Sequence, residues 1–224
     1  VYLSFAAGAE MWKRRGWNFY PRWQQESFGT DLSQGMGRGY LLCLVLLGVQ
    51  SLLFLIAENY FDMWATNDPA TSPYNMLWPV LFPLLAWGAA ISEEAVYRVF
   101  GIILFTKLLK NTFLAVLVPS MIWALGHTQY SVFPVYTRFF EVTLLGIILG
   151  YAFLKYGFMT VLFAHAIMDS ILMAFSLISL GGFANVFIGL FYIGFPALIA
   201  WLLSRLHKRF ISVRRAAHPQ EERI

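Results

Sequence analysis

The sequence predicts an all-α, polytopic membrane protein with about six transmembrane helices. Of its 224 residues, 59% are hydrophobic and only 12% are charged, whereas a soluble domain has about 25% charged residues. The mean hydropathy is +0.63. The apolar runs are continuous rather than alternating, which argues against a β-barrel. These observations exclude a disordered chain, a fibrous repeat and a free cytosolic domain.

The chain divides into three parts by composition. The N-terminal segment, residues 1–38, is rich in basic and aromatic residues, and we expect it at the membrane interface. Its first nine residues are apolar, and we expect this segment to be the remnant of a longer chain. Residues 39–204 form a transmembrane domain, with a motif-bearing core at 79–178, and residues 205–224 form a basic cytoplasmic tail.

Six apolar stretches account for the expected helices, at residues 40–57, 76–109, 112–126, 139–154, 158–180 and 183–203. As a helix, the second stretch would be roughly 50 Å long, too long for one straight crossing of a hydrocarbon core about 30 Å thick. Pro79, Pro83 and Gly88 are placed to kink it. In the fourth stretch, Gly146 and Gly150 predict a close approach between two helices.

The distribution of basic residues predicts the orientation. With the N-terminal side in the cytoplasm, 14 of the 16 Lys and Arg residues lie on the cytoplasmic side, the exceptions being Arg98 and Arg138. This positive-inside bias predicts a multi-pass protein with both termini cytoplasmic, and we expect it in a bacterial cell membrane. The cations flank apolar segments, so we expect contact with the lipid bilayer and not with nucleic acid. His207 and His218 lie in the basic tail, where we expect them to be solvated.

Several ionisable side chains fall within or beside the apolar stretches: Glu93, Glu94, Glu141, Asp169, His127 and His165. A charge at mid-membrane costs about 2.5–3.5 kcal/mol. Such groups are kept when they are paired, face a wet cavity or do chemistry, the alternative being polar contacts that join helices. We expect Glu141 to form a local ion pair with Arg138. The others form ordered pairs, which favours a functional site.

The first pair lies in the acidic motif Ser92-Glu93-Glu94-Ala95-Val96-Tyr97-Arg98. Glu94 and Arg98 are four residues apart, so they share a helix face and can form an ion pair. Glu93 points about 100° away from Glu94 and is the carboxylate left unpaired. A desolvated, unpaired carboxylate is suited to act as a general base or acid.

Two histidine motifs follow in later apolar stretches. Trp123 precedes His127 by four residues, so its indole could wall the site and hold the imidazole ring. His165 and Asp169 have the same spacing, and the carboxylate could fix the imidazole tautomer or accept its proton. Each motif alone is a weak signal, and the three together are a stronger one.

These motifs resemble the CAAX prenyl protease and bacteriocin-processing family of intramembrane proteases, also called the Abi family. The family pattern is Glu-Glu-x-x-x-Arg, then Phe-x-x-x-His, then His-x-x-x-Asn or Asp, on successive membrane helices. Trp123 departs from it, because it stands where Phe is usual. The resemblance covers about residues 79–178 and implies a hydrolase with its active site in the core of the helix bundle.

The resemblance also implies roles for the motif residues. Glu93 would activate a water molecule for attack on a peptide carbonyl, and His127 would help to hold that water. His165 and Asp169 would stabilise the oxyanion. The arginine of the acidic motif would orient the acidic pair, with the second glutamate in support.

A metal site is the alternative within the family, which has been described both as metalloproteases and as metal-free, glutamate-dependent enzymes. Glu93, His127, His165 and Asp169 could supply zinc with oxygen and nitrogen ligands. The His-Glu-x-x-His spacing of common zinc proteases is absent from the sequence. We therefore favour a metal-free site, with no cofactor, over the zinc alternative.

Depth in the membrane constrains this interpretation. His165 would lie about 10 Å from the cytoplasmic end of its span, and Glu93 about 24 Å from Lys110. The two meet only if the second helix projects into the cytoplasm, tilts strongly or breaks near Gly101, and we predict one of these. A separation above about 12 Å would contradict a shared catalytic role.

The function predicted by the resemblance is intramembrane endopeptidase activity on a membrane-associated protein or peptide. The substrate is open: a prenylated protein, a bacteriocin precursor or a membrane-anchored regulator would each suit. The main alternative is a catalytically inactive scaffold or bacteriocin-immunity-type protein of the same family. A third hypothesis is a transporter with a proton relay. The lack of a clear inverted repeat argues against it.

Overall fold

The structure, a computed structural model, describes residues 1–66, 68 and 72–217, and this part of the chain is built mainly from helices. In chain order the α-helices are α1 (Tyr2–Arg14), α2 (Phe28–Tyr60), α3 (Leu85–Glu93), α4 (Ile103–Leu109), α5 (Thr112–Leu125), α6 (Val135–Tyr156), α7 (Phe158–Ile178) and α8 (Phe183–Ala217). Two 3-10 helices, η2 (Pro73–Asn75) and η3 (Pro79–Leu84), precede α3, and a π-helix, η4 (Glu94–Ile102), joins α3 to α4. Two short strands, β1 (Trp64–Ala65) and β2 (Val132–Phe133), pair antiparallel.

Five helical segments of the described chain are long and apolar enough to cross a membrane: Phe28–Tyr60, Pro79–Leu109, Val135–Tyr156, Phe158–Ile178 and Phe183–Arg214. The third expected helix is α5, whose 14 residues make it only about 21 Å long. The prediction of an all-α, polytopic membrane protein is confirmed, and the chain is an integral membrane protein.

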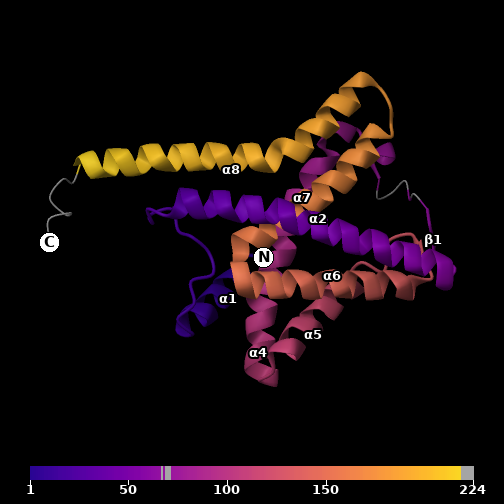
Figure 1. The fold of residues 1–224 in the computed structure, drawn as a ribbon, viewed down its shortest axis with the longest axis horizontal. Helices are drawn as coiled ribbons and strands as arrows, with labels where there is room; N and C mark the ends of the chain where they lie inside the picture. Colours follow the sequence, from indigo (N-terminus) through magenta and orange to yellow (C-terminus); the bar gives the residue numbers. More distant parts are fainter. Residues whose placement is uncertain (67, 69–71, 218–224) are drawn as a thin grey trace.

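The long second segment changes helix type along its length. It begins as the 3-10 helix η3, which contains Pro79 and Pro83, because proline lacks the N–H that an α-helix needs and clashes with the preceding turn. It continues through α3, the π-helix and α4. Figure 1 shows α4 running across the direction of α2 and α6. The last part of this segment is therefore inclined to these two helices.

Helix α7 lies at the centre of the bundle. Its Val161, Ala164 and Ile167 are fully buried, and α2, α3, α6 and α8 pack around it. Most of α7 is buried, which explains why its sequence is apolar on every face except at its few polar residues. The helix therefore holds its polar side chains in the core of the molecule.

Helices α5 and α6 approach closely, as the two glycines of α6 predict. A Cβ atom on Gly146 would lie 2.8 Å from the Cβ of Ser120, and one on Gly150 would lie 2.6 Å from Cγ1 of Val116. Both separations are too short for a side chain, so glycine is what permits this packing. The contact fixes α5, which leads into the loop that carries His127.

The two ends of the described chain pack against the bundle. Helix α1 packs mainly on η4. Helix α8 continues as one helix to Ala217, and His207 on it is buried, with Nε2 3.0 Å from the carbonyl of Trp23. The expectation that His207 is solvated is wrong, because the basic C-terminal part of α8 packs against the segment before α2. His218 lies outside the described residues, and the three-part division of the chain stays a prediction.

Candidate active site

The acidic motif straddles the junction of α3 and the π-helix. Glu93 is the last residue of α3, and Glu94 is the first residue of η4. Glu94 is fully buried and Arg98 is 2% exposed, with Nη1 of Arg98 3.1 Å from Oε1 of Glu94. The side chain of Glu93 is 26% exposed. The ion pair expected from the spacing is therefore present, and Glu93 is the carboxylate of the motif that is partly exposed.

His165 on α7 lies among three carboxylates. Its Nδ1 is 2.7 Å from Oε1 of Glu94, so this nitrogen carries a proton that it donates to the carboxylate. Its Nε2 is 3.4 Å from Oδ2 of Asp169 and 3.8 Å from Oε2 of Glu93. Since both ring nitrogens face acceptors, the doubly protonated imidazolium satisfies more of these contacts than either neutral tautomer.

His127 lies in the turn that follows α5. Its Nδ1 is 2.9 Å from the backbone carbonyl of Trp123, which can only accept, so Nδ1 carries the proton and Nε2 of the neutral ring has the lone pair. Nε2 is 4.0 Å from Oε2 of Glu93. Burial lowers the pKa of His127 below its ordinary value of 6.5, against the opposing effects of the Trp123 carbonyl and Glu93. His127 is therefore suited to accept a hydrogen bond at neutral pH.

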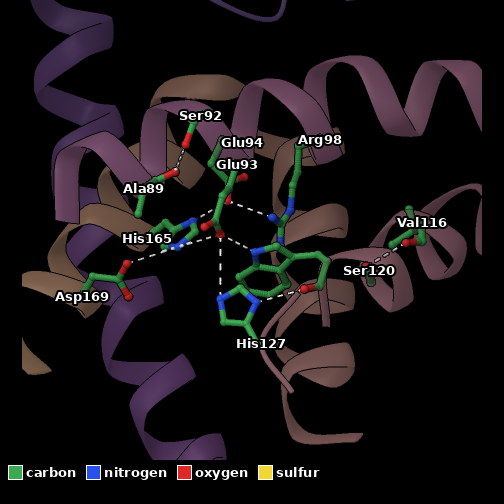
Figure 2. A network of polar contacts seen from close by, with 11 residues as sticks. Ala89, Ser92, Glu93, Glu94, Arg98, Val116, Ser120, His127, His165 and Asp169 are labelled. Carbon is green, nitrogen blue, oxygen red and sulfur yellow. Dashed lines mark hydrogen bonds and ion pairs between the residues drawn. The ribbon is translucent and has the colours of Figure 1, made fainter. Parts of the chain in front are cut away.

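Figure 2 shows how the motif residues meet: Glu93 points between His127 and His165, Asp169 lies beyond His165, and Arg98 lies on the other side of the acidic pair. The separation of 3.8 Å between His165 and Glu93 lies well inside the limit set for a shared role. The six residues of the three predicted motifs are thus brought together, from the α3–η4 junction, α7 and the loop after α5, whereas Glu141 lies apart from them.

Trp123 contributes more than the sequence interpretation assigned to it. Its Nε1 donates a hydrogen bond to Oε2 of Glu93, and the guanidinium of Arg98 lies over its ring at 4.3 Å from the centroid. The indole also meets the His165 ring edge-on, at 5.5 Å between centroids. The signal in the sequence was the replacement of phenylalanine by tryptophan, which adds an N–H donor, but spacing alone did not show its acceptor.

A second polar cluster lies at the interface of α2 and α6. Glu141 is buried, and it accepts hydrogen bonds from Arg138 and from Gln50, the latter at 2.7 Å. The local ion pair expected for Glu141 and Arg138 is confirmed. The guanidinium of Arg138 also lies 5.6 Å from the ring centroid of Tyr130, which stacks on His127. This cluster therefore supports the loop that carries His127.

The four side chains of the zinc alternative are near one another but do not form a metal centre in this structure. Across residues 1–66, 68 and 72–217, no group of three or more His, Cys, Asp or Glu side chains has an arrangement that could hold a metal ion. The Glu93 oxygen nearest the two histidines already accepts the Trp123 N–H. The zinc alternative therefore stays a prediction.

Comparisons with known proteins agree with the family resemblance. Residues 75–171 match the family described as "Type II CAAX prenyl endopeptidase Rce1-like", a range that contains every motif residue. The "Sporulation-killing factor biosynthesis protein SkfC" of Bacillus subtilis (strain 168) is 28% identical over 181 residues, 79% of this chain and 34% of the relative. The chain thus spans about a third of that relative's length. No solved structure matches the chain.

Proposed function

Because residues 75–171 of this chain match the Rce1-like family, we propose that it is an intramembrane endopeptidase that hydrolyses a peptide bond in a membrane-associated peptide or protein. One observation carries the proposal: the partly exposed Glu93 carboxylate lies 4.0 Å from Nε2 of His127 and 3.8 Å from Nε2 of His165. A base, a hydrogen-bond acceptor and a hydrogen-bond donor therefore surround one partly exposed point.

The first step uses Glu93 and His127. Two atoms 4.0 Å apart can both accept hydrogen bonds of about 2.8 Å from one water molecule. The water oxygen attacks the peptide carbonyl carbon while its proton passes to Glu93, which acts as general base. Neutral His127 holds the water through its Nε2 lone pair. The Trp123 N–H keeps the Glu93 carboxylate in place for this transfer.

The second step uses His165 and its carboxylate neighbours. The tetrahedral intermediate carries a negative oxygen, which an N–H at Nε2 of His165 stabilises. Glu94 holds the ring through Nδ1, and Asp169 holds it from the Nε2 side. The C–N bond then breaks, and protonated Glu93 returns its proton to the leaving amine. The products are a new carboxylate and a new amine, so water has been added across the bond.

We propose a peptide precursor as the substrate. The relative is named for the biosynthesis of a sporulation-killing factor, and cleavage of a precursor is a step that a peptidase supplies to such a biosynthesis. The family description names prenyl endopeptidases, and the proposed hydrolysis acts on a peptide bond whether or not the substrate carries a prenyl group. We also propose that both termini are cytoplasmic, from the positive-inside distribution of Lys and Arg.

A processing assay on whole membranes tests the proposal against the inactive alternative. Glu93→Ala and His127→Ala should each abolish release of the processed peptide. Glu58→Ala, which changes an exposed carboxylate at the end of α2, should process like the wild type. If both site variants process normally, the protein is a scaffold or an immunity-type protein and not a peptidase.

A further inference from the structure

Helix α1 makes a buried contact with the π-helix that carries the acidic motif. Nε1 of Trp12 donates a hydrogen bond of 2.8 Å to the backbone carbonyl of Val99, across 87 positions in the sequence. Trp12 is 6% exposed and Val99 is fully buried. The donor therefore comes from outside the matched family segment, which begins at residue 75.

The acceptor is a carbonyl of an irregular helix. Residues Glu94–Ile102 are π-helical, with hydrogen bonds from i to i+5 where the flanking α3 and α4 use i to i+4. A change of register between the two patterns leaves backbone groups with a weaker partner inside the helix, and buried carbonyls need partners. Val99 lies next to Arg98 in this segment. The indole N–H of Trp12 thus binds a backbone carbonyl within the π-helix.

The fit of α1 on η4 depends on a small residue. A Cβ atom on Gly8 would lie 2.7 Å from the carbonyl oxygen of Val99, so any larger residue would push α1 away from the π-helix. On its other side, Trp12 packs edge-on against Trp17 and Phe153, at 4.7 and 5.8 Å between centroids. Phe153 belongs to α6 and is fully buried. The indole is therefore held from both sides and its N–H has a fixed direction.

We propose that α1 is a positioning element of the active site: Trp12, through the Val99 carbonyl, holds the π-helix in the conformation that directs Arg98 and Glu94 to His165. Trp12 touches none of the reacting groups, so it acts through η4. The inference rests on the proposed peptidase function for its effect on rate. Its effect on the π-helix is independent of any activity.

Hydrogen–deuterium exchange on the full chain in detergent micelles tests the coupling. Trp12→Phe keeps an aromatic ring and removes the N–H, and it should speed amide exchange in peptides covering residues 94–104 by about five- to tenfold. Gly8→Ala keeps the indole, displaces α1 and should act in the same direction. Trp17→Phe is the matched control, since its indole packs in the same cluster without a hydrogen bond to η4, and it should leave this exchange unchanged.

Kinetics separate positioning from a general loss of structure. On a quenched fluorescent peptide that carries a sequence cleaved by the wild type, Trp12→Phe should lower kcat about tenfold and leave KM unchanged. Unchanged exchange in both α1 variants overturns the coupling. Faster exchange with an unchanged kcat overturns the positioning role. If the wild type cleaves no peptide, the proposed function fails, and the exchange measurement alone then supports or overturns the hold of α1 on the π-helix.

Discussion

The indole N–H of Trp123 donates to the carboxylate of Glu93, across the interface between α5 and the end of α3. Phenylalanine, the usual residue of the family motif, has no donor to make this bond. The same indole carries the Arg98 guanidinium on its face. Trp123 thus joins the carboxylate proposed as the base to the cation that neutralises its neighbour Glu94.

Replacing this donor gives a direct prediction. Trp123→Phe keeps an aromatic ring beside Arg98 and removes the hydrogen bond to Glu93, so the protein should fold but kcat/KM should fall about five- to tenfold, the worth of one hydrogen bond. The measurement is steady-state cleavage of a defined peptide by purified protein. Trp201→Phe, at an exposed position on α8, is the control and should match the wild type. Equal rates for Trp123→Phe and the wild type would contradict a role for the donor.

The Arg98–Glu94 pair should matter for stability. Both side chains are buried, and removing one partner of a buried pair leaves an uncompensated charge, which costs about 3–5 kcal/mol. Arg98→Ala should therefore lower the thermal unfolding midpoint in detergent by many degrees, and Arg98→Lys should lower it less. Arg14→Ala breaks the exposed pair with Glu10 and should leave the midpoint unchanged. A stable Arg98→Ala protein would show that the pair does not support the fold.

The pH dependence of the rate should reflect neutral His127. Burial lowers the pKa of this imidazole below 6.5, so the ring stays neutral as the pH falls to 6.5 and gains its proton only at a lower pH. Since water is held by the unprotonated Nε2, kcat/KM should stay level from pH 8 to 6.5 and fall below that. A profile that falls already between pH 8 and 7 would be inconsistent with this assignment. In His127→Gln, which has no titrating ring, the residual activity should lose this limb.

The close packing between α5 and α6 should make the protein's stability sensitive to added side-chain atoms at this contact. A methyl group on Gly150 would lie 2.6 Å from Val116, and such overpacking costs about 1–3 kcal/mol. Gly150→Ala should therefore lower the unfolding midpoint and displace α5, which leads to His127. Gly48→Ala places the same methyl group where nothing lies within 4 Å, and its midpoint should not fall. Equal midpoints for the two variants would rule out a tight α5–α6 contact.

Metal removal addresses the zinc alternative. We expect purified, active protein to contain far less than one zinc per chain by elemental analysis, and we expect its activity to survive EDTA and 1,10-phenanthroline. The reason is that the side chains of the described residues form no metal-binding group. One equivalent of tightly bound zinc, together with loss of activity on chelation and recovery on adding zinc back, would establish the metalloprotease alternative instead.

Much of the fold could be predicted because lipid imposes a simple pattern on the sequence. The stretch expected at 158–180 corresponds to α7 (Phe158–Ile178) and that at 112–126 to α5 (Thr112–Leu125), since length and apolarity decide where such helices lie. The ends of α2 and α8 were missed. Helix α2 begins at Phe28, before its apolar part, and α8 continues to Ala217, beyond its apolar part. Tertiary packing and not hydropathy sets these two boundaries.

The sequence could indicate which residues lie near one another in the candidate site, but it could not indicate most of their contacts. Helical spacing is enough to pair Glu94 with Arg98, because both lie on one element. The partners of His165 and Trp123 come from other helices, and no local pattern encodes them. The π-helix was also missed, because the difference between α and π hydrogen bonding leaves no clear mark on apolar periodicity. Trp12 illustrates both limits, since it reaches a π-helical carbonyl 87 residues away.

Oxygen-18 labelling tests the central claim most directly. Purified protein is incubated in H₂¹⁸O with peptides extracted from membranes, and new carboxyl termini are examined by mass spectrometry. The proposed hydrolysis predicts that the wild type produces termini with one ¹⁸O atom, and that Glu93→Gln, which keeps the size of the side chain but lacks the base, produces none. Labelled termini in equal amounts from both proteins, or none from the wild type, would contradict a Glu93-dependent peptidase.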